Sequence, residues 1–544
     1  MTHKIKAGIT RRTLLMSGAA AVGALSVGAR PTQLMAQTPA AEQVLKVAHG
    51  GFDLDWSPMR GGGRVLRWNS LWWASPMYFD ENAQIQPYVV TEWTPNDDMT
   101  EWTFTLNPDA VFSDGSPITA ADIKGSWELA AMPSTRHERV NQVLAGVVGY
   151  DEITGGETST LEGVATPDDQ TVVVTLGTPD PIFFMRIANH LIPIVKASEA
   201  RDENGEEVME WFAPENGGIT SGPFTMVELD VDGGSIAFEP NPNFFIEAPK
   251  LTRVEIQVIE DTVTATNLIA RGDMHAHTEL VTSTIIQDLG PEFSAGPQIP
   301  SGQHFWFNVN AAPFDDPMVR EAAILAVDRE GLIRASFPDG PHEMAEQILV
   351  GIDGVDPDWE PYPYDPERAR ELLAESSYGG PERLPRLILA GTTTPAITAA
   401  AQFIVEQWRQ NLGITAVELR PSLDGFRPAD VHIIRDDAGT RIPDAASFLN
   451  ANISTEGNIS KNKMNGYSNE EIDSLLDAAI DMAVDNPDRI GNAREAQRIF
   501  RDEFGFIPWY YETMSRWARA EVEGMEKNLD WQVIRPWNIQ IMES

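Results

Sequence analysis

Short runs in which apolar and polar residues alternate recur along the chain, and this period of two is typical of half-buried β-strands. In segment 101–106 every second residue is tryptophan, phenylalanine or leucine, and the residues between are polar. Segment 254–258 alternates in the same way, whereas 172–176 is mostly apolar. We therefore predict half-buried strands at the first two segments and a more fully buried strand at the third.

Helix start signals stand between these strands. Thr119 with Asp122 three residues later predicts a capping box, and Ser468 with Glu471 repeats the device. Asp365, directly before a proline, predicts a third helix start. Because strand and helix patterns interleave along the whole chain, the sequence predicts a mixed α/β fold.

Residues 1–41 predict an export signal instead of a folded element. Arg11 and Arg12 precede a mildly apolar run rich in alanine and glycine, 14–29, and small residues follow near positions 36 and 40. The run is shorter than the roughly 20 residues of a membrane-spanning helix, so we expect a cleaved signal and not an anchor. The arginine pair resembles a twin-arginine signal, whose cargo crosses the membrane already folded. A plain secretory signal is the alternative, and both lead to the periplasm.

The charge of the chain excludes one class of partner. The sequence has 81 acidic and 40 basic residues; five of the basic residues and none of the acidic ones precede position 42, so the remainder carries a net charge of −46. Such a surface repels phosphate backbones, and we expect no nucleic-acid partner. The charge is spread along the chain, which favours solubility in a salty medium over steering of cationic solutes.

The absence of cysteine excludes several kinds of chemistry. Disulfides, thiol nucleophiles, cysteine-based metal sites and a lipid anchor on an N-terminal cysteine are all impossible. The run Gly61–Gly63 lacks the lysine and hydroxyl residue of a phosphate-binding loop, and the common hydrolase and metalloprotease motifs are absent. We therefore expect a soluble protein that is not a lipoprotein and needs no cofactor.

Two smaller clusters could carry chemistry. His275 and His277, next to Asp273, could ligate a metal, but no third histidine is near in sequence, and a polar strand edge is the favoured interpretation. The acid pairs 97–98 and 315–316 resemble glycosidase carboxylates, although such pairs arise by chance at this density of acids. We assign neither a metal site nor a catalytic residue.

Five segments in a characteristic order carry a resemblance to a known family. The segment 86–122 ends in the run Val-Phe-Ser-Asp-Gly-Ser-Pro-Ile-Thr-Ala-Ala-Asp, and 220–224 is a Gly-Pro-Phe turn. The others are 305–322, 364–373 and 466–473. Together they resemble the extracytoplasmic solute-binding proteins of the peptide/nickel class, the family-5 binding proteins of ABC importers.

The resemblance implies a periplasmic binding protein-like α/β fold, with two large lobes joined by a hinge and an inserted smaller domain. We expect a discontinuous lobe I formed by 42–69, 216–300 and 512–544, an inserted lobe II at 70–215, and a lobe III at 301–511. Ligand would be enclosed by hinge closure, and the closed monomer would dock on a membrane permease.

In the resembling proteins an acid of the later lobe meets the amino group of the ligand. Here Asp436 and Asp437 follow an apolar strand at the start of a loop, where cleft residues commonly emerge. We expect one of them to bind an ammonium group, and a solvated loop is the alternative. The family's Gly-Trp is Ile434-Arg435 here, and Arg441 lies nearby. An anionic or sugar-like ligand, paired with an arginine, therefore stays open.

Tryptophans could supply the flat surfaces of a ligand site, since such rings stack on apolar or sugar faces. The sequence has fifteen. Those expected near the cleft are Trp56, Trp68, Trp72, Trp73 and Trp306. Packing in the core is the alternative for each of them, and Trp127 and Trp408 are assigned to the core outright.

The sequence thus predicts the periplasmic substrate-binding component of an ABC importer, which captures a small solute, foremost a short peptide, without transforming it. One alternative is a secreted, glycosidase-like hydrolase. Another is a sensor partner that keeps the fold but not the permease. A third is a binding protein for an oligosaccharide, an opine or a metal chelate, because one fold hosts many ligands.

Overall fold

The computed structural model describes residues 40–51, 57–60, 68–82, 84–282, 293–295, 299–338, 342–349, 354–391, 394–421, 430–438, 444–525 and 535–543. Four features of the sequence analysis lie outside these ranges: the export signal up to residue 39, Trp56, Gly61–Gly63 and Arg441.

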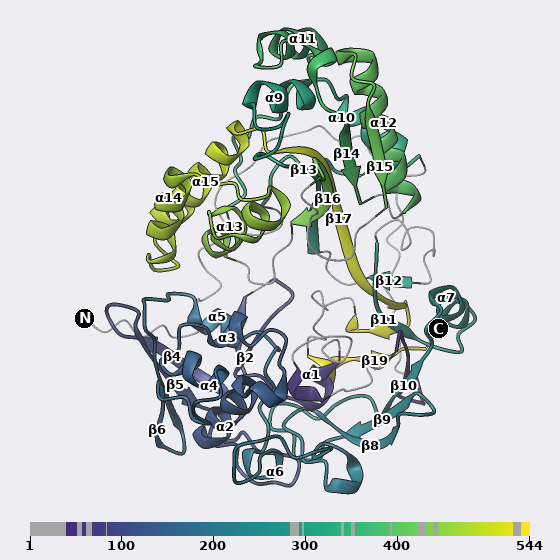
Figure 1. Ribbon diagram of the computed structural model, residues 1–544. Helices are drawn as coiled ribbons and strands as arrows, with labels where there is room; N and C mark the ends of the chain where they lie inside the picture. Colours follow the sequence, from purple (N-terminus) through teal and green to yellow (C-terminus); the bar gives the residue numbers. More distant parts are fainter. Residues whose placement is uncertain are drawn as a thin grey trace, which may run out of the picture.

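One large sheet organises the molecule (Figure 1). Within the described residues its order is β15-β14-β16-β13-β17-β11-β1-β10-β9-β8, and β12 pairs with β17 beside this path. The strands are β1 (Val44–His49), β8 (Phe224–Asp230), β9 (Ser235–Pro240), β10 (Arg253–Val258), β11 (Ala276–Thr282), β12 (Phe293–Ala295), β13 (Ile299–Phe307), β14 (Leu387–Ala390), β15 (Val417–Arg420), β16 (Ile433–Ala438) and β17 (Phe506–Arg519).

The strand β17 joins the two halves of the molecule. It runs from the upper half in Figure 1 to the lower half, and pairs with β13 over Phe506–Met514 and with β11 over Met514–Ala518. We call the lower part around β1 and β8–β11, with α7 (Thr262–Ala270), lobe I. The upper part around β13–β16 is lobe III. The sheet is therefore continuous across the border between them.

Lobe II is a smaller unit beside lobe I. Its antiparallel sheet has the order β4-β5-β7-β6. The elements are β4 (Val90–Pro95), β5 (Glu101–Leu106), β6 (Val164–Asp168), β7 (Thr171–Thr175), α2 (Ala120–Ala131), α3 (Asn141–Leu144), α4 (Tyr150–Thr154), α5 (Phe183–Ile187) and α6 (Ala197–Ala200). The short α1 (Asn69–Trp72), β2 (Met77–Phe79) and β3 (Ile85–Pro87) precede them. Lobes I and II share one hydrophobic core, which makes them one packed body.

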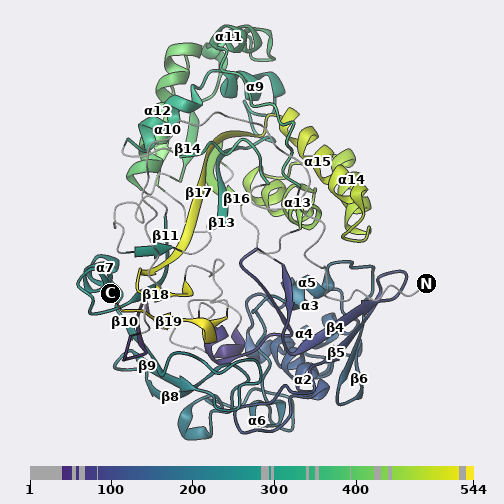
Figure 2. The same cartoon turned by 180° about the vertical axis from the view of Figure 1, so that it is seen from behind.

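Helices cover both faces of the lobe III strands (Figure 1, Figure 2). Phe305 and Phe307 pack in one core with the first helix group, and Trp306 faces the second group in a separate core. The first group is α9 (Pro317–Leu325), α10 (Arg329–Ser336), α11 (Pro366–Glu375) and α12 (Pro395–Leu412); the second is α13 (Ala445–Ile453), α14 (Glu470–Ile480) and α15 (Pro487–Asp502). Lobe III thus has its own apolar interior on each side of the sheet.

The mixed α/β class and several predicted elements are confirmed. In β5 the even-numbered residues are buried, as the alternation predicts. Thr119 caps α2, and its backbone N–H donates to Asp122 Oδ2 at 2.9 Å. Asp365 caps α11, with proline at the first helical position. Short-range chemistry fixes these starts, so they can be read from the sequence.

Two local predictions are wrong. β7 is not more fully buried than β5, because only Val172 and Val174 are buried and Thr175 is exposed. The N-cap of α14 is Asn469 and not Ser468, since Asn469 Oδ1 accepts hydrogen bonds from the backbone N–H groups of Glu471 and Ile472 in the first turn. The hydroxyl of Ser468 instead accepts a hydrogen bond from Thr455.

The predicted borders of the lobes fall inside elements. The border at 300/301 lies within β13, that at 511/512 within β17, and that at 69/70 within α1. The division of the chain into these three lobes stays a prediction, since a strand that passes from one lobe to the next has no single border residue.

A buried ion pair holds α13 onto its neighbours. Arg489, whose side chain is 2% exposed, donates to Asp444 Oδ1 at 2.7 Å and to Oδ2 at 3.0 Å. It also donates to the carbonyl oxygens of Ala479 and Met482, and Asp444 caps α13. Charges this deeply buried need all of these partners.

We predict that Arg489→Met lowers the free energy of unfolding by about 3–5 kcal/mol, because it leaves a buried carboxylate unpaired. Urea denaturation followed by tryptophan fluorescence measures the change. The control is Arg334→Met, which removes an arginine that is 66% exposed and is expected to change stability by less than about 1 kcal/mol. Equal effects of the two substitutions would contradict the assigned role.

The structure also predicts a loss of stability in mild acid. Burial lowers the pKa of His137 and of His190 from 6.5 to about 4 in each case. Between these values the unfolded chain binds protons that the folded chain does not, so stability falls as pH decreases from 6.5 toward 4. We expect roughly 1.4 kcal/mol per histidine for each pH unit in this window. Thermal melts of the native chain and of His190→Gln test this, since the variant should lose less stability between pH 7 and about pH 4.5.

Candidate ligand-binding cleft

The directions of the strands identify the edge where ligand chemistry is expected. β11 and β13 are antiparallel to β17, and β16 is antiparallel to β13. β1 runs parallel to β11, and β14 runs parallel to β16. Consequently β1 runs from lobe I toward lobe III, while β16 runs from lobe III toward lobe I. The carboxyl ends of both strands face the border between the lobes, which is where ligands bind in open α/β sheets.

The predicted acid pair lies at the carboxyl end of β16. Asp436 pairs in register with His304, and Asp437 with Gln303. Asp437 is exposed, and its Oδ2 accepts a hydrogen bond from Ser301 Oγ at 3.1 Å. The Asp436 side chain is 39% exposed. Both acids lie within the last residues of β16 instead of in the loop after it, and their contact with a ligand stays a prediction.

Lys463 is a member of this cluster that the sequence analysis missed. It ends a π-helix, Ile459–Lys463, a rare element that often occurs at functional sites. Its side chain is 9% exposed, and Nζ lies 3.2 Å from Asp436 Oδ2. Nζ also donates to the backbone oxygen of Asp437. The sequence gives no signal that separates Lys463 from the nearby Lys461.

The charge of Lys463 influences the neighbouring carboxylate. Although the residue is accessible to solvent, the protein around its carboxyl group displaces water and acts to raise the pKa of Asp437; Lys463, Asp436 and Ser301 outweigh this, and the pKa is lowered. Asp437 is therefore ionised at neutral pH and can accept hydrogen bonds from a cation.

A second network spans the three central strands. Gln303 on β13 is 1% exposed, and its Nε2 donates to Glu512 on β17 at 2.8 Å. Arg435 on β16 donates to Gln303 Oε1. Burial raises the pKa of Glu512, and Arg435 partly offsets this. Arg435 is thus engaged within the protein.

The face of β13 opposite Gln303 is closed. Trp306 is fully buried and donates from Nε1 to the backbone oxygen of Asp436 at 3.1 Å. His304 lies between Trp306 and Phe506, with ring centroids 5.0 Å and 4.8 Å away. Burial lowers the pKa of His304 to about 3, so its ring is neutral. This face supports the strand and gives a ligand no access in this conformation.

The other described tryptophans of the predicted set also pack in a core. Trp68, Trp72 and Trp73 are at most 4% exposed and belong to the shared core of lobes I and II. Trp72 contacts Phe238, with ring centroids 5.5 Å apart. The predicted stacking of these rings on a ligand therefore gains no support from the structure, whereas the core positions of Trp127 and Trp408 are confirmed.

The remaining clusters have local structural roles. His275 accepts a hydrogen bond from the backbone of Lys46, and His277 stacks on Trp517. No group of three possible metal ligands occurs among the residues that the structure describes. Asp316 caps α9, and Asp315 accepts a hydrogen bond from Tyr378.

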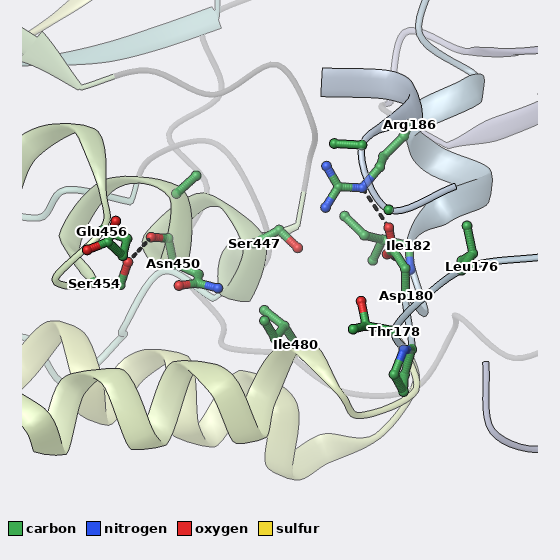
Figure 3. A pocket seen from close by; sticks show the side chains of 14 residues that line it. Leu176, Thr178, Asp180, Ile182, Arg186, Ser447, Asn450, Ser454, Glu456 and Ile480 are labelled. Atoms are coloured by element: carbon green, nitrogen blue, oxygen red, sulfur yellow. Dashed lines mark hydrogen bonds and ion pairs between the residues drawn. The ribbon is translucent and has the colours of Figure 1, made fainter. Parts of the chain in front are cut away.

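A pocket of about 390 Å³ separates lobe II from lobe III (Figure 3). One wall comes from lobe II, where Arg186 Nε donates to Asp180 at 2.8 Å, and the other from α13 and the turn after it. Its lining residues are Ala145, Gly146, Leu176, Thr178, Pro179, Asp180, Ile182, Arg186, Ser447, Asn450, Ala451, Ser454, Glu456 and Ile480. Lobe II and lobe III thus face each other across this pocket.

Known proteins share this organisation. A family model described as bacterial extracellular solute-binding proteins, family 5 Middle, matches residues 84–459. The periplasmic oligopeptide-binding protein OppA of Salmonella typhimurium (strain LT2) is 26% identical over 460 residues, which cover 82% of each chain. The periplasmic murein peptide-binding protein MppA of Escherichia coli (strain K12) is 26% identical over 471 residues, covering 82% of this chain and 84% of MppA.

Solved structures of such proteins have a similar fold. The solved structure of the murein tripeptide-binding protein MppA in an unliganded open form aligns with a TM-score of 0.77 and 24% identity, covering 93% of this chain and 99% of that chain. The predicted family and the periplasmic binding protein-like fold are confirmed. Within the described residues, no helix combines the length and the apolar character needed to cross a bilayer.

Proposed function

Because the chain belongs to the bacterial extracellular solute-binding proteins of family 5, we propose that it captures a short peptide in the periplasm and delivers it to the permease of an ABC importer. The observation that carries this proposal is the exposed Asp437 at the carboxyl end of β16, on the lobe border. OppA and MppA, which are named for peptide binding, support the choice of a peptide.

Asp437 suits the amino end of a peptide for geometric and electrostatic reasons. Ser301 holds one carboxylate oxygen, so the side chain is oriented before ligand arrives. A carboxylate can accept several hydrogen bonds, and an ammonium group provides three donors. Hydrogen bonds between charged groups are the strong ones, which makes this contact a main source of affinity.

Closure of lobe III over lobes I and II would enclose the ligand. Lobes I and II share one core, whereas lobe III has separate cores. The strands β13 and β17 connect the two bodies, and this arrangement favours a hinge at the strands. The pocket between α13 and lobe II is the space that closure would narrow. A ligand drives this step only by binding the closed state more tightly.

The remaining parts of the proposal follow from the sequence. The N-terminal segment is a twin-arginine-type signal, the exported protein is a soluble monomer, and it is not an enzyme. Three of the four acids that resemble glycosidase carboxylates form hydrogen bonds within the protein: Asp315 with Tyr378, Asp316 with Ser377, and Asp98 with Thr100.

We predict that Asp437→Asn weakens the binding of tetra-alanine at least about fivefold, corresponding to the roughly 1 kcal/mol of a hydrogen bond to a charged group. Isothermal titration calorimetry measures the affinity. N-acetyl-tetra-alanine lacks the ammonium group and should bind equally weakly to both proteins. Asp97→Asn, at an exposed turn of lobe II, is the matched control. Unchanged affinity of Asp437→Asn for the free peptide would remove this residue from the site.

We further predict that saturating peptide shortens the distance between lobe II and α13. The chain has no cysteine, so Thr178→Cys with Asn450→Cys accepts two spin labels at unique positions across the pocket. Double electron–electron resonance measures the distance. A pair within lobe III, Asn450→Cys with Ser474→Cys, should show no change. A constant distance across the pocket, with peptide bound, would exclude closure as the mode of capture.

A further inference from the structure

A buried cation, Lys463, lies next to the acid pair. The Lys463 side chain is 9% exposed, and its Nζ lies 3.2 Å from Asp436 Oδ2. The same ammonium donates to the backbone oxygen of Asp437. It therefore binds one carboxylate and the main chain of the next, at the end of β16.

The two carboxylates are consequently not equivalent. Adjacent residues of a strand point to opposite faces, and Asp436 is turned toward Lys463 and receives the backbone N–H of Asp437 at Oδ1, 2.9 Å away. Asp437 accepts a hydrogen bond from Ser301, and Lys463 acts on it through its charge. Asp436 is thus paired with a lysine of the protein, while Asp437 is the more exposed of the two residues.

The other charges of the cluster also compensate each other. Arg435 and Glu512 are linked through Gln303. The neutral ring of His304 adds no charge. Among the described groups around the end of β16, Asp437 is therefore the carboxylate left for a ligand.

We propose that Lys463 determines the charge selectivity of the cleft, so that the bound end of the ligand carries a single positive charge. This inference rests on the proposed function and makes it more specific. The preferred peptide presents its α-ammonium group to Asp437 and has no basic side chain at its first residue. The acid pair and Lys463 together carry one net negative charge, and Lys463 Nζ is bonded to the main chain of Asp437 itself. A second ammonium at the first residue of the peptide therefore finds no further unpaired carboxylate and is repelled by Lys463, since like charges in a partly buried site repel each other.

The π-helix provides a matched control. Lys461 lies two residues before Lys463 on the same element, yet its side chain is 49% exposed and pairs with Glu456. Lys461→Met and Lys463→Met thus each remove one positive charge from the same helix. Only Lys463→Met removes the partner of Asp436 and of the Asp437 backbone oxygen.

The experiment compares two peptides, tetra-alanine and Lys-Ala-Ala-Ala, by isothermal titration calorimetry. The measured quantity is the ratio of their affinities. We expect Lys463→Met to shift this ratio toward Lys-Ala-Ala-Ala at least about fivefold, because the lysine of the peptide can occupy the place of the missing ammonium. Asp436→Asn leaves Lys463 uncompensated and should shift the ratio in the opposite direction.

Two further variants complete the test. The double variant Asp436→Asn with Lys463→Met should return close to the native ratio, and Lys461→Met should leave the ratio unchanged. Circular dichroism checks that each variant is folded; Asp436→Asn, which keeps the buried lysine, tests the proposal if Lys463→Met does not fold. If Lys463→Met and Asp436→Asn fold and bind peptide but keep the native ratio of affinities for the two peptides, Lys463 does not determine charge selectivity. Failure of the native protein to bind either peptide would instead overturn the proposed function, and this inference with it.

Discussion

The structure depends on one strand that two lobes share. β17 supplies hydrogen bonds to β13 in lobe III and to β11 in lobe I. Backbone hydrogen bonds are lost at a cost when a strand is interrupted inside a protein, so the lobes cannot separate there. They can only bend about this connection. The same pairing fixes the directions of β1 and β16, and thereby brings their carboxyl ends to a common border.

Around that border, buried charges are paired before any ligand arrives. Lys463 binds Asp436, Gln303 joins Arg435 to Glu512, and Arg489 holds the cap of α13. A charge that loses its partner in a partly buried site is strongly destabilising. This explains why the cleft can carry many ionisable groups and still present one carboxylate to a ligand.

Local signals in the sequence predicted the local structure, and they failed where distant residues decide. Thr119 and Asp365 were predicted as caps because the partner backbone lies within one helical turn. For α14 the predicted N-cap, Ser468, is wrong by one residue, because the side chain of its neighbour Asn469 accepts the hydrogen bonds of the first-turn backbone. For Trp306 the sequence leaves the cleft and the core open, because the helices that cover each face of its strand decide between them; the structure has it in a core. Lys463 could not be predicted, since its partners are 26 and 27 residues away and its contact depends on the π-helix.

The strong negative charge of the chain also bears on the conformational equilibrium. Lobes that carry charge of the same sign repel each other as they approach, and salt weakens this only beyond about 8–10 Å. A cation bound between the lobes lowers that repulsion, because it adds positive charge where the surfaces come closest. An ammonium group at Asp437 would therefore do more than form hydrogen bonds. It would favour the closed state over the open one, and this difference in affinity is what a ligand needs to shift the equilibrium.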